Sequence, residues 1–410
     1  MLKNYLKLAF KVLLRRKFFT LINLFAISLT LMVLMVATAV LDQIFGPLPP
    51  EANRHRTLGV YYAKMSGPQS VSSGFPGYRF LDRYVRNLPQ AEKVSICSIF
   101  ETTTVYRQGE PIKLWLKYTD GAFWEILGFD FLEGGPFTAD DDRNGHLVAV
   151  INEATRGKFF DGQPAVGRNL EIDGRQFRVI GVVANAPFLR LLPFADIWIP
   201  HGSTRVRSNE MIGNYLGMIL ARDAQDIPTI KAEFQARLSQ VEFDDPKQFN
   251  HFESAPETFF EYSSRLLSQD SPGSRPGLLL AGLIGGAILF MLLPAINLIN
   301  INLSRIMERS SEIGVRKAFG ASSWTVLSQF VIENVMLTLL GGAIGLALSR
   351  IVLFEITASG LIPWADFQLN YRIFGYGLLM AVCFGLLSGV YPAWKMSRLH
   401  PVDALKGGGR

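Results

Sequence analysis

The chain has 410 residues, of which 49% are hydrophobic, and it carries a formal net charge of +6 at pH 7. Basic and acidic residues occupy different segments, so the positive charge does not indicate nucleic-acid binding, and we expect no nucleic acid among the partners. The two cysteines, Cys97 and Cys383, fall in a mixed region and in an apolar region, respectively, which excludes a fold held together by an intrachain disulfide.

Four apolar runs are each long enough to cross a bilayer, which takes about 20 helical residues. Residues 18–41, 276–304 and 373–394 contain no charged side chain, and residues 324–349 contain only Glu333. We therefore predict an α-helical membrane protein with four transmembrane helices. A soluble protein with four buried helices is the alternative. A cleaved signal peptide is an alternative for the first run, which is longer than the about 7–15 residues of a signal core.

The distribution of lysine and arginine predicts the orientation of these helices. Six occur in residues 1–17, four in residues 305–323 and four in residues 395–410, whereas residues 42–275 carry 25 basic and 29 acidic residues. Basic residues near membrane spans favour the cytoplasmic side. We therefore place the termini and residues 305–323 inside, and residues 42–275 (the outer domain) and the short loop 350–372 outside. This pattern predicts a multi-pass membrane protein with a large domain on the outer side of the membrane.

In chain order, residues 1–17 are predicted to form an amphipathic helix on the cytoplasmic face, and a plain basic flank is the alternative. The outer domain has the short apolar runs and turn signals of a large mixed α/β domain between the first two helices. We predict strands at residues 146–152, 170–172, 177–183 and 196–200, with Asp173-Gly174 as a hairpin turn, a helix at 228–241, a mobile loop at 65–77 and a linker at 268–277.

The sequence carries few signals of catalysis. It has no His-Glu-x-x-His, Cys-x-x-Cys or Gly-x-Ser-x-Gly pattern, and no Walker A pattern. The acidic run Asp140-Asp141-Asp142 either binds calcium or is a solvated turn, and it lacks the alternating oxygen ligands of a calcium loop. We expect no catalytic, cofactor or metal site on this chain. If ATP drives the protein, another polypeptide binds it.

Polar and small residues inside the apolar runs mark contacts between helices, because polar side chains in a membrane face protein. Asn297 and Asn300 lie one turn apart in the second run, and Gly341-Gly342 and Gly345 give the third run a small-residue face. These residues therefore predict close helix packing.

Glu333 lies near the middle of the third apolar run. A carboxylate at this depth is by default a candidate functional group. The alternative is a packing residue that is protonated or hydrogen-bonded, with Gln329 or Asn334 as its partner. The sequence does not decide between these two roles.

Residues 305–323 connect the second and third runs and have the local signals of a short helix. Ser310-Ser311 offer an N-cap, and Gly320 is placed to end the helix. Glu312 and Arg316 form an i,i+4 pair in the favourable order, with the acid first. An ordinary loop helix among the lipid headgroups is the simplest interpretation of this spacing.

The same segment resembles the cytoplasmic segment of the MacB/FtsX-like (type VII) ABC transporter permeases. The resemblance is carried by Asn300 to Ser322, by Gln329-Phe330 with Glu333, by Gly341-Gly342, by the C-terminal Tyr391-Pro392-Ala393 and His400-Pro401, and more weakly by residues 148–182. It implies a four-span, multi-pass permease of the bacterial inner (plasma) membrane with a MacB-like periplasmic domain.

The resemblance also implies residue roles and partners. The permease would form a dimer with a second copy or a related permease, and would pair with a cytoplasmic ABC ATPase subunit that binds ATP and Mg. Residues 312–320 would be the coupling helix, with ATPase contacts at Glu308, Arg309, Glu312, Ile313, Gly314, Arg316, Lys317 and Gly320. Packing or gating in the membrane would fall to Asn297, Asn300, Gln329, Glu333, Gly341 and Gly342.

Three functions follow. In the first, ATP hydrolysis on the partner moves the outer domain, a mode called mechanotransmission, so that an envelope substrate is exported or extracted, in some assemblies with a periplasmic adaptor protein. The second is an FtsX-like signal transmitter that regulates an envelope enzyme without transport, although its outer domain is typically smaller than the 234 residues found here. The third is a membrane-anchored enzyme, against which the missing catalytic motifs argue.

Overall fold

The computed structural model describes residues 10–11, 13–15, 17–107, 109–204, 210–266, 273–308, 315, 319 and 322–397. The chain divides into two compact units, which are described separately below. The helical unit comprises Met1–Leu41, Leu279–Ser359 and Phe367–Arg410. The outer unit comprises Asp42–Leu278 and Gly360–Asp366, so it contains the predicted outer domain and part of the loop that follows the third apolar run.

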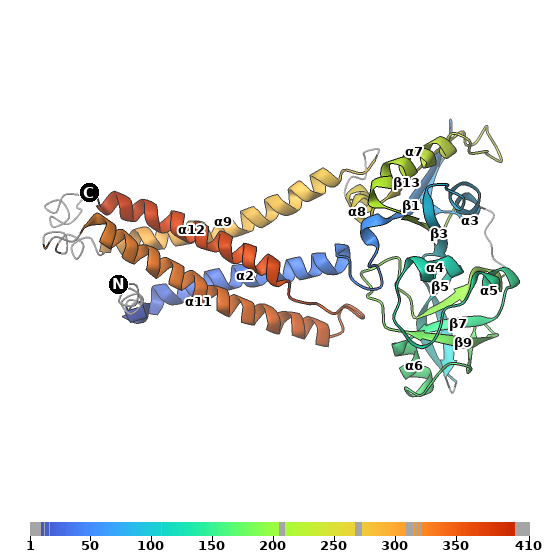
Figure 1. The fold of residues 1–410 in the computed structure, drawn as a ribbon, viewed down its shortest axis with the longest axis horizontal. Coiled ribbons are helices and arrows are strands. Elements are labelled where there is room, and N and C mark those ends of the chain that lie inside the picture. Colours follow the sequence, from blue (N-terminus) through green and yellow to red (C-terminus); the bar gives the residue numbers. More distant parts are fainter. Residues whose placement is uncertain are drawn as a thin grey trace. The chain divides into compact units, whose positions relative to one another are not determined.

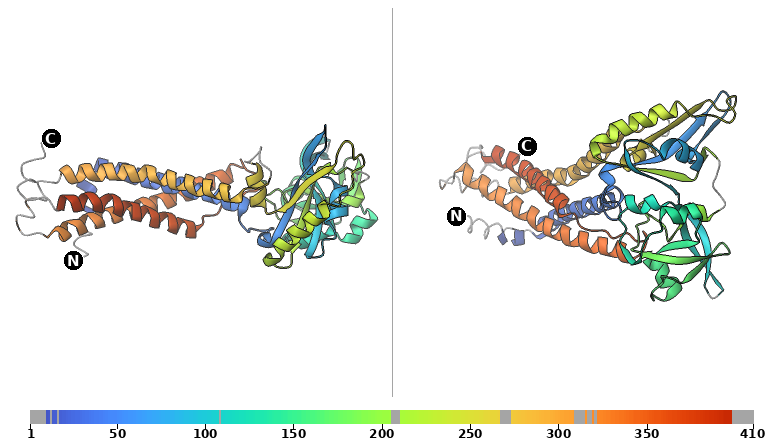
Figure 2. Two further views of the ribbon diagram at one scale, coloured as in Figure 1. Left: turned by 90° about the horizontal axis from the view of Figure 1, so that it is seen from above. Right: turned by 45° about the vertical axis from the view of Figure 1, so that its right-hand side comes forward.

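Long helices form the helical unit and run side by side in Figures 1 and 2. They are α2 (Lys17–Phe45), α9 (Pro276–Glu308), α11 (Ser323–Ala358) and α12 (Tyr371–Ser397). By length and composition, α2 and residues Val331–Ala358 of α11 are able to cross a membrane. The described apolar parts of α9 and α12, Pro276–Leu292 and Tyr371–Cys383, are shorter. A helix therefore occupies each predicted run, while the count of four spans stays a prediction.

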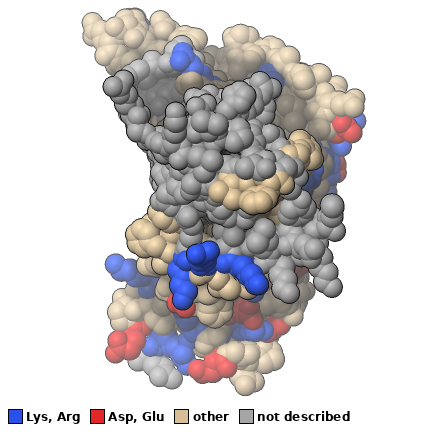
Figure 3. Space-filling model, turned by 90° about the vertical axis from the view of Figure 1, so that its left-hand side faces the viewer, with Lys and Arg blue, Asp and Glu red and all other residues tan. Residues whose placement is uncertain are grey.

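The predicted amphipathic helix at residues 1–17 lies mostly outside the described residues. Phe10, Lys11 and residues 13–15 are helical, and Leu13 is buried in a cluster with Ile27, Leu31 and Leu337. The described basic side chains of this segment, Lys11, Arg15 and Lys17, are exposed. Figure 3 shows the molecule from the end at which this segment lies, with lysine and arginine in blue.

The outer unit is built on strands in two halves. The first half holds β1 (Thr57–Ser66), β2 (Val71–Pro76), β3 (Ala91–Ser98), β11 (Ile212–Gly213), β12 (Tyr215–Ala221) and β13 (His251–Glu257). The second half holds β4 (Glu101–Arg107), β5 (Glu110–Thr119), β6 (Phe131–Gly134), β7 (Val148–Asn152), β8 (Asn169–Ile172), β9 (Arg175–Val183) and β10 (Ile197–Pro200).

The strands run in the order β11-β2-β1-β12-β3-β5-β10-β7-β9-β6, with β13 beside β1, β4 beside β5 and β8 beside β9. The halves meet where Cys97 of β3 lies opposite Thr119 of β5. Antiparallel pairs are joined by two parallel ones, β5 with β10 and β7 with β9, so the sheet is mixed.

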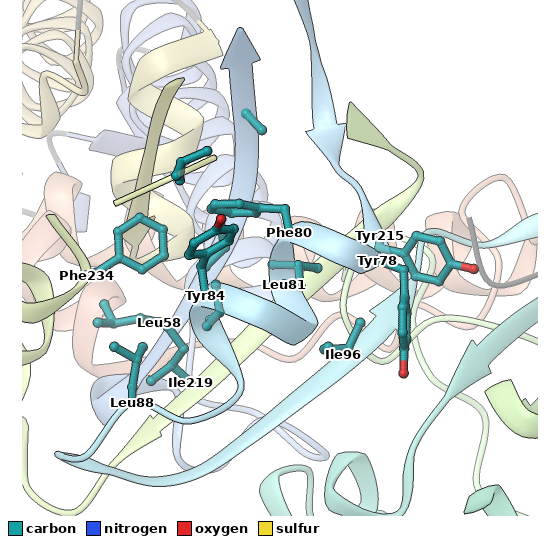
Figure 4. Packing of buried hydrophobic residues seen from close by; sticks show 14 of the residues in the cluster. Leu58, Tyr78, Phe80, Leu81, Tyr84, Leu88, Ile96, Tyr215, Ile219 and Phe234 are labelled. Carbon is teal, nitrogen blue, oxygen red and sulfur yellow. The ribbon is translucent and has the colours of Figure 1, made fainter. Parts of the chain in front are cut away.

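Short helices cover the strands. They are α3 (Tyr78–Phe80), which continues as the turn η2 (Leu81–Val85), α4 (Gly121–Ile126), α5 (Ala139–Asn144), α6 (Glu153–Phe160), α7 (Ile227–Leu238) and α8 (Phe259–Leu266), with single turns η1 (Arg54–Arg56), η3 (His201–Ser203) and η4 (Ala224–Asp226). In the first half, Phe80 stacks on Phe252 at 4.4 Å between ring centres. Phe80 also packs edge-on against Phe234 of α7 (Figure 4). Trp124 and Trp198 of the second half pack together in another cluster, which also includes Tyr61 of β1 and Met218 of β12.

Several sequence predictions in the outer domain are confirmed. Strands β7, β8, β9 and β10 occupy the four predicted runs. Helix α7 covers most of the helix predicted at 228–241 and buries Ile230 and Phe234. Strands β8 and β9 form the predicted hairpin. Its turn residues, Asp173 and Gly174, have φ of 48° and 73°, the positive values that a tight two-residue hairpin turn requires.

The prediction of a mobile loop at residues 65–77 is wrong. Residues Val71–Pro76 form β2, which pairs antiparallel with β1 from Ala63 opposite Gly74 to Ser66 opposite Val71. Serine and glycine suggested a loop, but the side chains of β2 are largely exposed or half-exposed, so the strand needs little apolar surface. Only the connection between Ser66 and Val71 is a turn.

Candidate functional site

The predicted coupling segment lies almost entirely outside the described residues. Glu308 is the last residue of α9, and the side chains of Arg309 through Gly314, Arg316, Lys317 and Gly320 are not described. Val315 and Phe319 are described and exposed, and the Phe319 N–H donates to the Val315 oxygen at 3.1 Å. That bond spans four residues, as in an α-helix, and so agrees with the predicted short helix.

Inside the helical unit the structure brings together part of the predicted membrane site. Glu333 is buried, and Gln329 Nε2 donates to Glu333 Oε1 at 2.9 Å. Gln329 and Glu333 are one turn apart on α11, which places their side chains on the same face of the helix. Of the two candidate partners, Gln329 thus donates a hydrogen bond to Glu333. Asn297 and Asn300 are residues of α9 whose backbone is helical, but their side chains are not described.

The small-residue face of α11 is where this helix meets α2. A Cβ atom added to Gly341 would lie 2.8 Å from Ile27, and one added to Gly345 would lie 3.0 Å from the Ser28 backbone oxygen. Gly342 faces Leu378 of α12. Glycines four residues apart let two helix backbones approach closely, and in lipid such packing drives helix association. The predicted packing role of Gly341 and Gly342 agrees with this geometry.

Valine at Gly345 should loosen this crossing. Overpacking a tight contact typically costs about 1–3 kcal/mol, and here the nearest atom is a backbone oxygen that cannot rotate away. The purified full-length chain should show a lower midpoint of thermal unfolding in detergent. Gly375→Val on α12 is the matched control, because a Cβ at Gly375 meets no described atom within 4 Å. Equal midpoints for both variants would contradict the assignment.

Asn23 of α2 is a polar residue that the sequence analysis missed. Its side chain is fully buried, and neither its Nδ2 nor its Oδ1 has a hydrogen-bond partner among the described residues. An unpaired buried amide is costly in a membrane environment, so such a group marks a helix contact. A lone asparagine within a long apolar run was the available signal.

The acidic run of the outer domain has structural contacts. Asp140 forms an ion pair with Arg143. Asp141 and Thr138 form the capping box of α5, in which each side chain accepts a hydrogen bond from the other residue's N–H. Asp142 accepts a bond from the Gly202 N–H at 2.7 Å. Among the described residues no cluster of three or more histidine, cysteine or acidic side chains is placed to hold a metal ion. The acids therefore act here as helix caps and loop anchors.

Two buried cations in the outer unit were not predicted. Lys117 of β5 is fully buried and donates to the backbone oxygens of Leu191 and Leu192 at 2.9 and 2.5 Å. Burial lowers the pKa of Lys117 from 10.5 to about 8. Arg190, the second buried cation, is adjacent in sequence to these acceptors. Arg190 lies in the connection between strands β9 and β10, and the Lys117 side chain bonds to that connection from β5.

The lowered pKa of Lys117 predicts a stability that rises at alkaline pH. Below pH 8 the ammonium is protonated in both folded and unfolded chains, whereas between pH 8 and 10.5 the unfolded chain binds more protons. The free energy of unfolding of wild type relative to Lys117→Met should therefore increase by about 3 kcal/mol over this range. Denaturant titrations of the full chain at each pH measure it. Lys113→Met, on the exposed face of β5, should give no such rise; a rise of equal size would contradict the assignment.

In the part of the chain that the structure describes, two helices are long and apolar enough to cross a membrane, and a large mixed α/β domain lies between the first two long helices. Residues 20–237 match the MacB-like periplasmic core domain, and residues 284–401 match the FtsX-like permease C-terminal domain. The chain belongs to the MacB/FtsX-like family of ABC transporter permeases.

Curated relatives are longer than this chain. The macrolide export ATP-binding/permease protein MacB of Burkholderia cenocepacia is 30% identical over 294 residues, which covers 69% of this chain and 40% of that protein. MacB of Chromobacterium violaceum is 29% identical over 286 residues, which covers 69% of this chain and 42% of that protein. The chain thus spans less than half the length of these two relatives.

Solved structures align with part of the chain. The periplasmic region of MacB from Actinobacillus actinomycetemcomitans aligns with a TM-score of 0.37 and 13% identity, covering 53% of this chain and 94% of that one. A domain of a putative permease protein from Porphyromonas gingivalis aligns with a TM-score of 0.41 and 13% identity. The alignment covers 50% of this chain and 90% of that domain.

Proposed function

We propose that this chain is the permease of a MacB/FtsX-type exporter that converts ATP hydrolysis into movement of its outer domain. The energy comes from an ABC ATPase subunit bound at residues 308–320 on the cytoplasmic side. The moving outer domain exports or extracts an envelope substrate. The match to a MacB-type outer domain and the export function named for the relatives favour this function over the signal-transmitter alternative.

One structural observation carries the proposal. Helix α2 is continuous from Lys17 to Phe45, and its last turn belongs to the outer unit. An α-helix of 29 residues is a stiff rod of roughly 44 Å at about 1.5 Å per residue. A displacement of its basic N-terminal end is therefore passed to the outer domain without a flexible linker.

The proposal includes an assembly. We place the four long helices across the inner membrane, and we place two permeases, identical or related, in one complex with the ATPase. A periplasmic adaptor is a further partner of the outer domain. Affinity purification of the tagged chain from its own membranes, followed by mass spectrometry, tests this assembly. An ABC ATPase should copurify in near-stoichiometric amount, and its absence from a complex stable enough to retain a second permease would overturn the proposal.

The proposed orientation predicts cysteine accessibility. Cys383 is replaced by alanine, whereas Cys97 is retained because its thiol is buried and its pKa is raised by burial to about 11. A cysteine at Ser73, which is exposed on β2, should react with a membrane-impermeant thiol reagent in cells with a permeabilised outer membrane. A cysteine at Ser311 should react only after the inner membrane is opened. The reverse pattern of labelling would contradict the orientation.

A further inference from the structure

The last turn of α2 ends in carbonyl groups that have no N–H partner within the helix, as at every helix C-terminus. Two arginines supply donors. Arg190 donates to the Gln43 oxygen at 3.1 Å and to the Gly46 oxygen at 2.9 Å, and Arg54 donates to the Ile44 oxygen at 2.5 Å. Both cations complement the negative end of the helix dipole. All of these residues belong to the outer unit.

Arg190 differs from a capping arginine at the protein surface in its burial and in the number of its hydrogen bonds. Its side chain is fully buried, and its Nη1 donates to the Leu48 oxygen and to Glu51 Oε2, each at 2.9 Å. Stability alone does not require such a pair, because apolar residues of similar volume often replace a buried ion pair without loss. What a guanidinium adds is a rigid fork that binds several oxygens in fixed directions. The geometry of the chain from Gln43 to Glu51 is thereby tied to one side chain.

The backbone that carries Arg190 is fastened to β5. Lys117 holds the oxygens of Leu191 and Leu192, as described above. Asp196 Oδ2 accepts a bond from the Trp115 N–H at 2.9 Å, and Trp115 is two residues from Lys117 on the same strand. Residues 187–196 are therefore held against the second half of the outer domain at two points.

The same segment reaches a third element. The Phe188 N–H donates to the Pro363 oxygen at 3.0 Å, and Pro363 lies between α11 and α12 in the part of the loop that belongs to the outer unit. The Phe188 ring packs against Trp115 and Phe194. Residues 187–196 thus contact the end of α2, the loop between α11 and α12, and strand β5.

We propose that residues 187–196 form a joint, with Arg190 as its coupling residue, that makes the second half of the outer domain follow the end of α2. The inference rests on the proposed function and deepens it by naming the contacts through which movement is passed. Arg190 is a positioning residue, because it acts through the end of α2 and touches no substrate.

The first test measures the joint without any nucleotide. Spin labels are attached at Leu48 and Glu153, two exposed positions, in full-length chain carrying Cys383→Ala in lipid nanodiscs. Wild type should give a narrow distance distribution, and Arg190→Lys, which keeps the charge but loses the fork, should broaden it. Arg237→Lys is the matched control, since Arg237 donates to the backbone oxygens of Tyr84 and Asn87 far along the chain from α2.

The second test measures transmission in the complex with the ATPase. Spin labels at Thr357 and Glu153 report the distance between these two residues before and after the complex is trapped with ATP and orthovanadate. Trapping should shift the distance in wild type and in Arg237→Lys. In Arg190→Lys the fraction of molecules that shift should fall by about tenfold or more, because charge-assisted hydrogen bonds are lost, while ATP hydrolysis continues.

The outcomes separate the joint from the proposed function. If Arg190→Lys matches wild type in both distances, or if Arg237→Lys fails as badly, the joint is refuted. If the wild-type complex hydrolyses ATP with no change in distance, the proposed function fails, and the first label pair still tests the joint. Arg190→Met with Glu51→Met removes both partners of the Arg190 ion pair; Arg54 loses its contact with Glu51 at 3.6 Å but keeps its bond to the Ile44 oxygen. Wild-type transmission in that variant would also overturn the role of Arg190.

Discussion

Glu312→Lys should abolish productive contact with the ATPase while leaving the chain in the membrane. The change puts a cation at the N-terminus of the predicted coupling helix, against the helix dipole, and sets like charges at i,i+4 with Arg316. It also reverses a charge at the proposed interface, where losing one partner of an ion pair costs about 2–5 kcal/mol. Copurification of the ATPase should therefore fall by about tenfold or more at normal expression of the permease.

The matched control for this variant is Glu355→Lys. It makes the same change of net charge on an exposed residue near the end of α11, on the side predicted to face the periplasm. It should retain the ATPase. If Glu312→Lys copurifies and functions like wild type, residues 312–320 are not the coupling helix.

The elements that were predicted correctly are those with local signals. The long helices follow from the length of their apolar runs, and the β8–β9 hairpin follows from Asp173-Gly174 between two apolar stretches. The bond between Gln329 and Glu333 was also within reach, because residues one turn apart share a helix face. In each case the residues that determine the feature are close to one another in sequence.

The joint could not be predicted, because its partners are distant in sequence. Arg190 and the Gln43 oxygen are 147 residues apart, and Lys117 is 75 residues from the Leu192 oxygen. A single lysine in a strand and a single arginine in a loop normally indicate exposed side chains, so their burial depends on tertiary contacts. Strand β2 was missed for a related reason, since its pairing with β1, rather than its own composition, makes it a strand.

Glu333 should act through hydrogen bonding and not through charge. It is buried, and Gln329 donates to it at 2.9 Å within a helix that is long and apolar enough to cross a membrane. An ionised, unpaired carboxylate at such a depth is costly, and no second carboxylate or histidine lies within the four predicted spans to continue a proton path. We therefore expect Glu333 to act in packing among the helices or in their response to the predicted coupling helix.

This assignment predicts opposite results for two substitutions. Glu333→Gln keeps the shape and an oxygen acceptor for Gln329, so ATPase-coupled function should stay within about twofold of wild type. Glu333→Leu leaves the buried Gln329 amide without this acceptor, at a cost of about 1–3 kcal/mol, and should lower the fraction of assembled complex in native gels. Gln329→Leu should weaken assembly in the same direction. A Glu333→Gln permease that assembles normally but is inactive would instead establish a role for the charge or the proton.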